Sequence, residues 1–265
     1  MDLIAVPGAE LATVALGAPA APPMVMLHGL ISGNLASWYS SIASPLSAQR
    51  RVLLYDQRGH GGSSMPRSGF DLDRQADDLA AVLAYHGQAE ARVDIVGHSM
   101  GALIALRFAL RRPSAVRRLV LVDAPMPARD HVAPSLLGPD TPAELSAYLD
   151  RQYGEGPGRR RERQQQRLHA LFFESTLRDD VRAMDGEADA ALAMLDRPVL
   201  LLYGRQSPCR DAGVRLAAAL PDARLEWLDC GHYIPEEAPQ ALLAALNHFL
   251  KSDMQEASQL LREPA

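Results

Sequence analysis

The sequence predicts an α/β fold built on a mostly parallel, doubly wound sheet, and two patterns carry this prediction. Short apolar runs alternate along the chain with segments of helical spacing, as in repeated β-α-β units. The runs are apolar at nearly every position, which is typical of parallel strands covered on both faces. The expected strands are residues 25–27, 52–55, 93–96, 119–122, 199–203 and, more weakly, 225–228, with 11–16 as a leading antiparallel edge strand. The expected core helices are residues 73–85, 100–110 and 238–250.

Residues 125–195 interrupt this alternation without a convincing strand. Prolines are frequent at the start of the segment, and amphipathic pieces follow at 143–153, 159–173 and 178–195. A connection of roughly 70 residues is too long for a plain loop, so we expect a helical insertion that forms a lid. The chain then divides into a core at 1–124 and 196–250, the lid at 125–195, and a C-terminal tail at 251–265 that is either a short helix or frayed.

Composition excludes several classes of protein. Hydrophobic residues make up 48% and charged residues 22% of the chain, which excludes a mainly disordered protein. A net charge of −5 argues against a nucleic-acid partner, since such binding neutralises many phosphates. The N-terminus lacks the basic residues of a signal peptide, and no apolar run is long enough for a membrane span. The two cysteines are too few for a disulfide framework, so we expect free thiols in a cytoplasmic protein.

The run Gly-His-Ser-Met-Gly at 97–101 is the sharpest chemical signal. It follows an expected strand and opens an expected helix, which is the context that a nucleophilic serine on a strained turn requires. Glycine at both ends removes side chains that would collide across the turn, so the Ser99 hydroxyl is lifted clear of the sheet. An ordinary glycine turn is the alternative, and the flanking strand and helix favour the nucleophile.

A second turn, His-Gly-Leu at 28–30, follows the expected strand at 25–27. The amide of Leu30 and the amide of Met100 are the candidate donors to an oxyanion. His28 and Trp38 are candidate lining residues of the substrate pocket, although His28 reads more simply as a structural hydrogen-bonding residue and Trp38 equally as a core residue.

His232 is the candidate base. It follows the expected strand at 225–228, at the sheet edge where loops gather around the nucleophile. The other histidines lie inside the serine turn, at helix ends, in a glycine-rich turn or in the insertion. Tyr233, which is next in the chain, is a further candidate contact for the substrate.

These elements together resemble the α/β-hydrolase fold family. The chain also carries Asp-Gln-Arg-Gly-His-Gly-Gly-Ser at 56–63, a turn that recurs in the esterase, epoxide-hydrolase and haloperoxidase-like branches of that family. The resemblance covers roughly residues 25–250 and implies a serine carboxylesterase or thioesterase that forms an acyl-enzyme and needs no cofactor. Serine in place of aspartate at position 99 excludes the ester-forming route of epoxide hydrolases and dehalogenases.

The acid is the point at which this chain departs from the family. Most members carry a Gly-x-x-Asp turn, whereas residues 204–207 read Gly-Arg-Gln-Ser. Asp123, at the end of the strand after the nucleophile helix, is a position that some members use, and small bacterial acyl esterases of the YbfF type are similar in both respects. We favour Asp123, although a strand-end aspartate often only satisfies loop amides. Asp211 reads as a helix cap, Asp229 is awkwardly close in sequence to His232, and a Ser–His pair without an acid is the last alternative.

The insertion carries Arg-Arg-Arg-Glu-Arg at 159–163. A solvated helix face is the simpler interpretation of this run. The alternative is a site for a phosphorylated acyl carrier, such as coenzyme A or an acyl carrier protein, with Arg159 and Arg163 as contacts, because guanidinium groups bind phosphate well.

Two other functions stay open on the sequence alone. A lyase or a carbon–carbon bond hydrolase uses the same serine, histidine and aspartate on a different substrate. A non-catalytic ligand-binding homologue would account for the missing carboxylate turn. The sequence has no His-x-His, Cys-x-x-Cys or His-Glu-x-x-His pattern, so we expect no metal site.

Overall fold

The computed structural model describes residues 1–265 except 31–32, 126–138, 154–157 and 261–265. Eight strands form one sheet in the order β1-β2-β4-β3-β5-β6-β7-β8. Neighbours from β4 to β8 in this order are parallel, and β2 is antiparallel to both β1 and β4. The strands are β1 (Asp2–Val6), β2 (Ala9–Leu16), β3 (Pro23–Leu27), β4 (Arg51–Tyr55), β5 (Val93–His98), β6 (Val116–Val122), β7 (Val199–Gly204) and β8 (Ala223–Leu228). The predicted mostly parallel, doubly wound sheet is confirmed.

The prediction that residues 11–16 form the edge strand is wrong. This segment belongs to β2, which is antiparallel as expected, but β1 pairs with its outer side and is the true edge. β1 was not predicted, because its five residues include only two buried apolar side chains, Ile4 and Val6. Gly8, with φ of 78°, makes the turn that returns the chain as β2.

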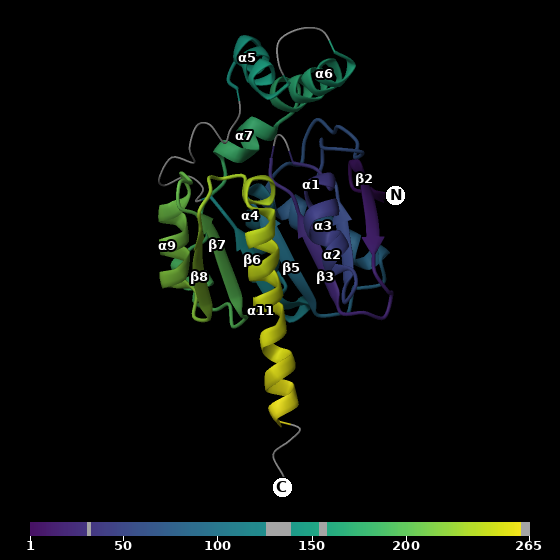
Figure 1. Cartoon of the computed structure of the whole chain (residues 1–265). Helices are drawn as coiled ribbons and strands as arrows, with labels where there is room; N and C mark the ends of the chain where they lie inside the picture. The colour runs from purple at the N-terminus through teal and green to yellow at the C-terminus, as the bar shows by residue number, and fades with distance from the viewer. Residues whose placement is uncertain (31–32, 126–138, 154–157, 261–265) are drawn as a thin grey trace.

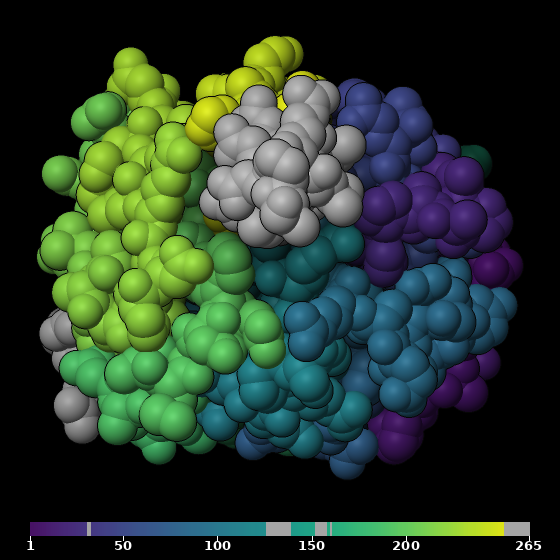
Figure 2. Space-filling view, turned by 90° about the horizontal axis from the view of Figure 1, so that it is seen from below, coloured from purple at the N-terminus to yellow at the C-terminus, as the bar shows by residue number. Residues whose placement is uncertain are grey.

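Helices cover both faces of the sheet (Figure 1). On one face, α3 (Leu72–Tyr85), α4 (Met100–Arg111) and α9 (Arg210–Ala219) contribute buried apolar side chains to one cluster. The opposite cluster contains residues of α1 (Ala36–Trp38), the π-helical turn η1 (Tyr39–Ala43), α2 (Ser44–Leu46), α10 (Ile234–Glu237) and α11 (Pro239–Leu260). Figure 2 shows the purple N-terminal part of the chain and its yellow-green part on opposite sides, as expected for a sheet that runs from β1 to β8.

The last helix is longer than the sequence predicted. The apolar spacing ends near residue 250, whereas α11 continues to Leu260 and so includes much of the expected tail. No helix in the described part of the chain combines the length and the apolar character that crossing a bilayer requires.

Between β6 and β7, the described residues form four helices: α5 (Pro142–Tyr153), α6 (Arg159–Phe173), α7 (Leu177–Arg182) and α8 (Asp189–Leu192). Figure 1 shows α5, α6 and α7 standing over one end of the core. The helix expected at 178–195 is instead two short helices, because residues 183–188, which include Gly186, are not helical. Most of the proline-rich opening of the segment, residues 126–138, lies outside the described residues.

The register of the parallel strands brings four strand ends to one edge. Leu27 on β3 pairs with Gly97 on β5, and His98 on β5 pairs with Val122 on β6. Val122 in turn pairs with Leu202 on β7. The residues that follow these strands therefore meet where the chain order reverses between β3 and β5, which is where α/β sheets form their ligand crevice.

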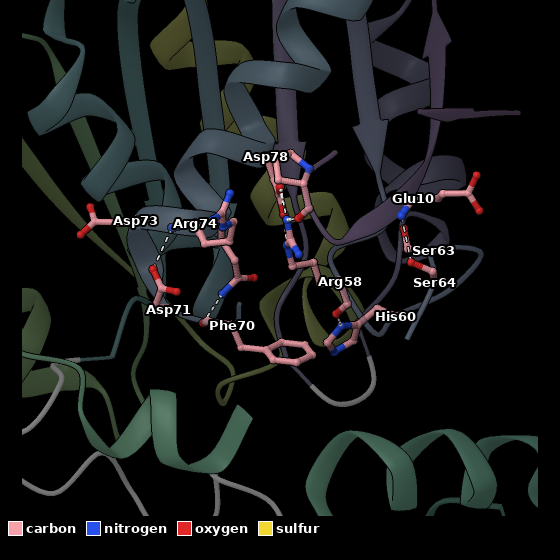
Figure 3. A network of polar contacts seen from close by, with 12 residues as sticks. Glu10, Arg58, His60, Ser63, Ser64, Phe70, Asp71, Asp73, Arg74 and Asp78 are labelled. Carbon is pink, nitrogen blue, oxygen red and sulfur yellow. Dashed lines mark hydrogen bonds and ion pairs between the residues drawn. The ribbon is translucent and has the colours of Figure 1, made fainter. Parts of the chain in front are cut away.

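A buried ion pair fixes the turn at 56–63 to the core (Figure 3). The Arg58 side chain donates to Asp78 on α3, with Nη2 2.7 Å from Oδ1. The two side chains are only 1% and 3% exposed. Burial raises the pKa of Asp78 even though Arg58 opposes this shift. The carboxylate therefore depends on its partner, because an unpaired buried charge is far more costly than a paired one.

Replacing Arg58 with leucine should lower the free energy of unfolding by about 3–5 kcal/mol, because Asp78 stays buried without its cation. The double variant Arg58→Leu/Asp78→Leu should regain much of this loss, since neither residue then carries a charge to desolvate. Urea unfolding at neutral pH measures both. Arg112→Ala is the control: its pair with Asp77 is about half exposed, so it should cost less than about 1 kcal/mol. A double variant no more stable than Arg58→Leu alone would contradict this interpretation.

Candidate active site

Ser99 lies on a strained turn between β5 and α4. Its backbone has φ of 53° and ψ of −118°, which residues other than glycine rarely adopt. A Cβ atom at Gly97 would lie 2.3 Å from the carbonyl oxygen of Gly101, and one at Gly101 would lie 2.5 Å from that of His28. Both positions therefore require glycine. The strand and the helix close on each other, and the serine lies at the apex of the turn between them.

Ser99, His232 and Asp123 come from distant parts of the sequence and form one chain of hydrogen bonds. The Ser99 hydroxyl lies 3.0 Å from Nε2 of His232, and Nδ1 of the same ring lies 2.6 Å from Oδ2 of Asp123. The three residues are 6%, 7% and 0% exposed in that order. A carboxylate beside Nδ1 keeps the ring proton on that atom, so Nε2 presents its lone pair to the serine.

Among the candidate acids, Asp123 is the one whose carboxylate contacts His232. Asp123 follows β6 with φ of 48°, and it shares this unusual sign among the described non-glycine residues only with Ser99. Asp229 instead accepts a hydrogen bond of 2.7 Å from Gln206 at the surface. Asp211 lies in the first turn of α9, whose N-cap residue is Cys209, so the interpretation of Asp211 as a helix cap is wrong.

Ser207 occupies the turn in which the resemblance to the α/β-hydrolase family predicts an aspartate. Its hydroxyl donates to Oδ2 of Asp123 and accepts a hydrogen bond of 3.0 Å from the Cys209 amide. The Gly204 amide donates to the other carboxylate oxygen across 2.9 Å. The turn after β7 thus supports a carboxylate supplied by β6. Sequence reasoning gave Ser207 no role, because the contact depends on the pairing of β6 with β7.

Cys209 is a second neighbour that sequence reasoning missed. Its Sγ lies 3.7 Å from Nδ1 of His232. Burial, followed by the charge of Asp123, raises the pKa of the thiol to about 12, so it stays neutral at physiological pH. The possible ligand atoms of Asp123, Cys209 and His232 lie within 4.8 Å of one another and are a conceivable metal-binding group. The atoms of Asp123 and His232 are already hydrogen-bonded, so an ion would have to displace those bonds.

Ser99 and His232 line a pocket of about 440 Å³, counting space open to solvent. Of the residues predicted to contact substrate, His28, Trp38 and Tyr233 also line it. Trp38 is fully buried, and its indole Nε1 has no hydrogen-bond partner among the described residues. The predicted pocket walls therefore lie together.

The two residues predicted to donate to an oxyanion lie at the pocket and at the start of the helix after Ser99. Leu30 lines the pocket, and Met100 is the first residue of α4. The amides in the first turn of a helix have no acceptor within that helix and carry its positive dipole end. The arrangement can therefore stabilise negative charge next to the Ser99 hydroxyl.

Three buried histidines around the site are neutral at physiological pH. Burial is the largest cause in each case, and it lowers the pKa to about 4 for His28 and His98 and to about 3 for His60. Nε2 of His98 lies 2.8 Å from the carbonyl oxygen of His232. Nε2 of His28 accepts from the Gln57 amide across 2.9 Å, and its Nδ1 bonds to the Gly29 carbonyl. Both ring nitrogens of His28 are therefore engaged in hydrogen bonds, and the residue contributes to the pocket lining through its ring.

Arg159 and Arg163 lie outside this pocket. Both are exposed on α6 and line a second cavity, which shares Gly33 with the first. The distance of these two arginines from the Ser99 pocket therefore depends on how the insertion folds.

Comparison with known proteins agrees with this architecture. A model of the alpha/beta hydrolase fold family matches residues 22–239. The 2-(acetamidomethylene)succinate hydrolase of Mesorhizobium japonicum is 28% identical over 252 residues, which cover 86% of this chain and 88% of that protein. A crystal structure of a hydrolase from Pseudomonas aeruginosa PA01 is similar with a TM-score of 0.76 and 27% identity, covering 94% of this chain and 97% of that one. The esterase RhEst1 from Rhodococcus sp. ECU1013 follows with a TM-score of 0.74 and 25% identity, covering 94% and 98%.

The chain therefore belongs to the α/β-hydrolase fold family and is an enzyme of the hydrolase type. The fold class and the family predicted from the sequence are confirmed.

Because these buried histidines are neutral in the folded protein, we expect the free energy of unfolding to fall in acid. Their pKa values are below 6.5 in the folded protein, so between about pH 6.5 and 4 the unfolded chain binds more protons. The stabilisation is complete above pH 6.5 and is lost as the pH falls towards 4, by something of the order of 3 kcal/mol for each ring. Urea unfolding at several pH values measures this slope.

His98→Gln should make the slope shallower, because one of the three titrating rings is gone. His248→Gln, at an exposed position of α11, is the matched control and should keep the wild-type slope. Stability that stays constant between pH 7 and 4.5 would show that these rings do not control it.

Proposed function

We propose that the protein hydrolyses a carboxylic ester or thioester through an acyl-enzyme on Ser99, with His232 as the base and Asp123 as the acid of a catalytic triad. The observation that carries this proposal is the chain of hydrogen bonds from Ser99 through His232 to Asp123 at the wall of a pocket. The esterase and hydrolase names of the relatives support the same class of reaction.

In the first step, Nε2 of His232 accepts the hydroxyl proton as Ser99 Oγ forms a bond to the acyl carbon. The carbonyl π electrons move to oxygen, where the amides of Leu30 and Met100 donate to the negative charge. When the tetrahedral intermediate collapses, the bond to the alcohol or thiol breaks, and the leaving group takes the proton from Nε2. Water then repeats the sequence on the acyl-serine and releases the acid.

The negative charge of Asp123 stabilises the imidazolium that forms in each step. The Gly204 amide and the Ser207 hydroxyl hold the carboxylate, so the ring of His232 meets a fixed acceptor. The buried surroundings strengthen this interaction because little water screens it. The neutral His98 adds no competing positive charge and bonds to the backbone of His232.

The insertion suits the role of a lid in this proposal. It brings α6 beside the cavity that adjoins the Ser99 pocket. The leaving group is an alcohol or a thiol, and a thiol carried on coenzyme A or on an acyl carrier protein falls within this class.

Ser99→Ala should abolish hydrolysis of p-nitrophenyl esters while the free energy of unfolding stays close to that of the parent. Loss of a triad nucleophile removes roughly 10⁶-fold of the rate in a well-studied serine protease, and a smaller enhancement survives through the oxyanion donors. A fluorophosphonate probe, read by peptide mass spectrometry, should label Ser99 of the wild-type chain.

The same two measurements separate the alternatives. Labelling of Ser99 without turnover of esters or acyl-CoA would favour a lyase or a carbon–carbon bond hydrolase. No labelling and no turnover would favour a non-catalytic binding protein. Turnover by Ser99→Ala near the parent rate would contradict the nucleophile.

Asp123→Asn should lower kcat by about 10²–10⁴, because the amide removes the charge and can hold the wrong tautomer of His232. Adding Ser207→Asp to that variant should recover activity, since the Ser207 hydroxyl already contacts Oδ2 of Asp123. Asp229→Asn is the matched control and should keep kcat within about twofold, because its carboxylate contacts Gln206 and is exposed. An Asp123→Asn enzyme nearly as active as the parent would exclude this acid.

A further inference from the structure

A second cavity of about 970 Å³, including space open to solvent, lies between the turn at 56–63 and α6. We call it the arginine cavity, and its lining includes Asn34, His60, Arg159, Arg163, Gln164 and Arg167. It shares Gly33 with the Ser99 pocket. The rings of His28 in the pocket and His60 in the cavity have centroids 5.1 Å apart. The Ser99 pocket and the arginine cavity therefore adjoin each other.

The three arginines project from one face of α6, because they follow each other at intervals of four residues. Arg167 is fixed to the core: its Nε donates to the Gly59 carbonyl across 2.8 Å, and Nη2 donates to the Ser63 carbonyl across 2.7 Å. Arg159 and Arg163 are exposed and have no hydrogen bond or ion pair with another described residue. Like charges at this spacing weaken a helix, so the fold gains nothing from placing them together.

The Asp56 carboxylate near the arginine cavity is already engaged. Asp56, whose charge reaches Arg167, accepts amide hydrogen bonds of 2.6 Å from both Leu35 and Gly62. Glu162 and Glu174 line a different cavity beside α6. The guanidinium groups of Arg159 and Arg163 thus lack a partner anion within the part of the chain that the structure describes.

His60 supplies an independent sign that a ligand belongs here. The residue is only 3% exposed, and its Nδ1–H donates to the Arg58 carbonyl across 2.7 Å. Nε2 therefore has a lone pair, and this buried atom has no hydrogen-bond partner. Figure 3 shows the ring at the end of the turn, towards the helices of the insertion. A buried acceptor without a partner is costly. His60 lines the arginine cavity, so an O–H or N–H group of a ligand that reaches Nε2 from the cavity would satisfy this atom.

We propose that the arginine cavity binds an anionic group of the substrate, a carboxylate or a phosphate that carries or adjoins an O–H or N–H donor, while the scissile acyl bond lies at Ser99. Arg159 and Arg163 each offer paired N–H donors that suit such an oxyanion. Arg167 adds a fixed positive charge, and Nε2 of His60 accepts from the donor. This proposal rests on the proposed hydrolase function and names its substrate class.

Anion binding to the whole chain tests the cavity without any catalytic step. Inorganic phosphate carries an O–H at neutral pH and sulfate does not, so calorimetry should show tighter binding of phosphate than of sulfate. Arg159→Gln/Arg163→Gln should weaken both by about tenfold or more. Arg161→Gln is the matched control on the same helix, because that guanidinium pairs with Asp150 on α5, and it should bind both anions as the wild type does. Equal binding of the anions by the wild type and the double variant would overturn the proposal.

Matched substrates then identify the source of the anion. The phosphate pair is butyryl-phosphopantetheine and the neutral butyryl-N-acetylcysteamine, and the carboxylate pair is p-nitrophenyl hemisuccinate and p-nitrophenyl butyrate. Arg159→Gln/Arg163→Gln should raise KM about tenfold for the anionic member of the pair that the cavity recognises and change the neutral member less than twofold. A selective loss in the first pair assigns a phosphorylated carrier, and one in the second assigns a small dicarboxylate-like substrate. Equal losses for anionic and neutral members overturn the proposal.

The outcome stays separable from that of the proposed function. If the wild type binds phosphate but hydrolyses neither member of either pair, the hydrolase function fails and the anion site stands. If the neutral esters are hydrolysed and the double variant shows no selective loss, the hydrolase function stands and the anion site fails.

Discussion

The contact between Asp123 and His232 joins the end of β6 to the loop after β8, and the geometry of the site depends on it. Asp123 adopts a left-handed backbone conformation at the end of its strand. The Gly204 amide at the end of β7 and the Ser207 hydroxyl in the turn after it hold its carboxylate. The ring of His232 then meets a fixed acceptor on one nitrogen and the Ser99 hydroxyl on the other. Both strained residues, Ser99 and Asp123, follow neighbouring parallel strands, so the pairing of β5 with β6 sets the distance between them. The strained backbone conformation persists at these two positions because the surrounding sheet constrains the chain on both sides of each residue.

The electrostatics of the site follow from burial. Asp123 is fully buried, and its charge has the Ser207 hydroxyl, the Gly204 amide and the His232 ring as partners. The nearby Cys209 thiol stays protonated, and His98 stays neutral, because burial disfavours their charged forms. In the proposed reaction, the positive charge that develops on His232 therefore meets one compensating negative charge and no competing cation among these neighbours.

The sequence predicted the features that are local in the chain. The strained turn at 97–101 could be recognised because the strand, the turn and the helix are contiguous in the sequence. The core strands could be recognised because burial on both faces keeps them apolar. β1 could not, since a short strand with two buried side chains carries little pattern. The sequence also did not predict that the helix expected at 178–195 is divided in two. The helical spacing of apolar residues continues across residues 183–188, although these residues are not helical. The contacts of Ser207 and Cys209 arise only when β6, β7 and the His232 loop meet, so no spacing in the sequence reports them.

The tautomer of His232 is the most direct measure of whether Asp123 controls the site. In the whole chain labelled with ¹⁵N-histidine, long-range ¹H–¹⁵N correlation at mildly alkaline pH identifies which ring nitrogen carries the proton, and the His232→Gln variant assigns the signal. The structure predicts a proton on Nδ1, shifted downfield by the carboxylate, and an unprotonated Nε2 facing Ser99. In Asp123→Asn the downfield proton should disappear. A wild-type ring that carries its proton on Nε2 would contradict the assignment of Asp123 as the acid and of His232 as the base.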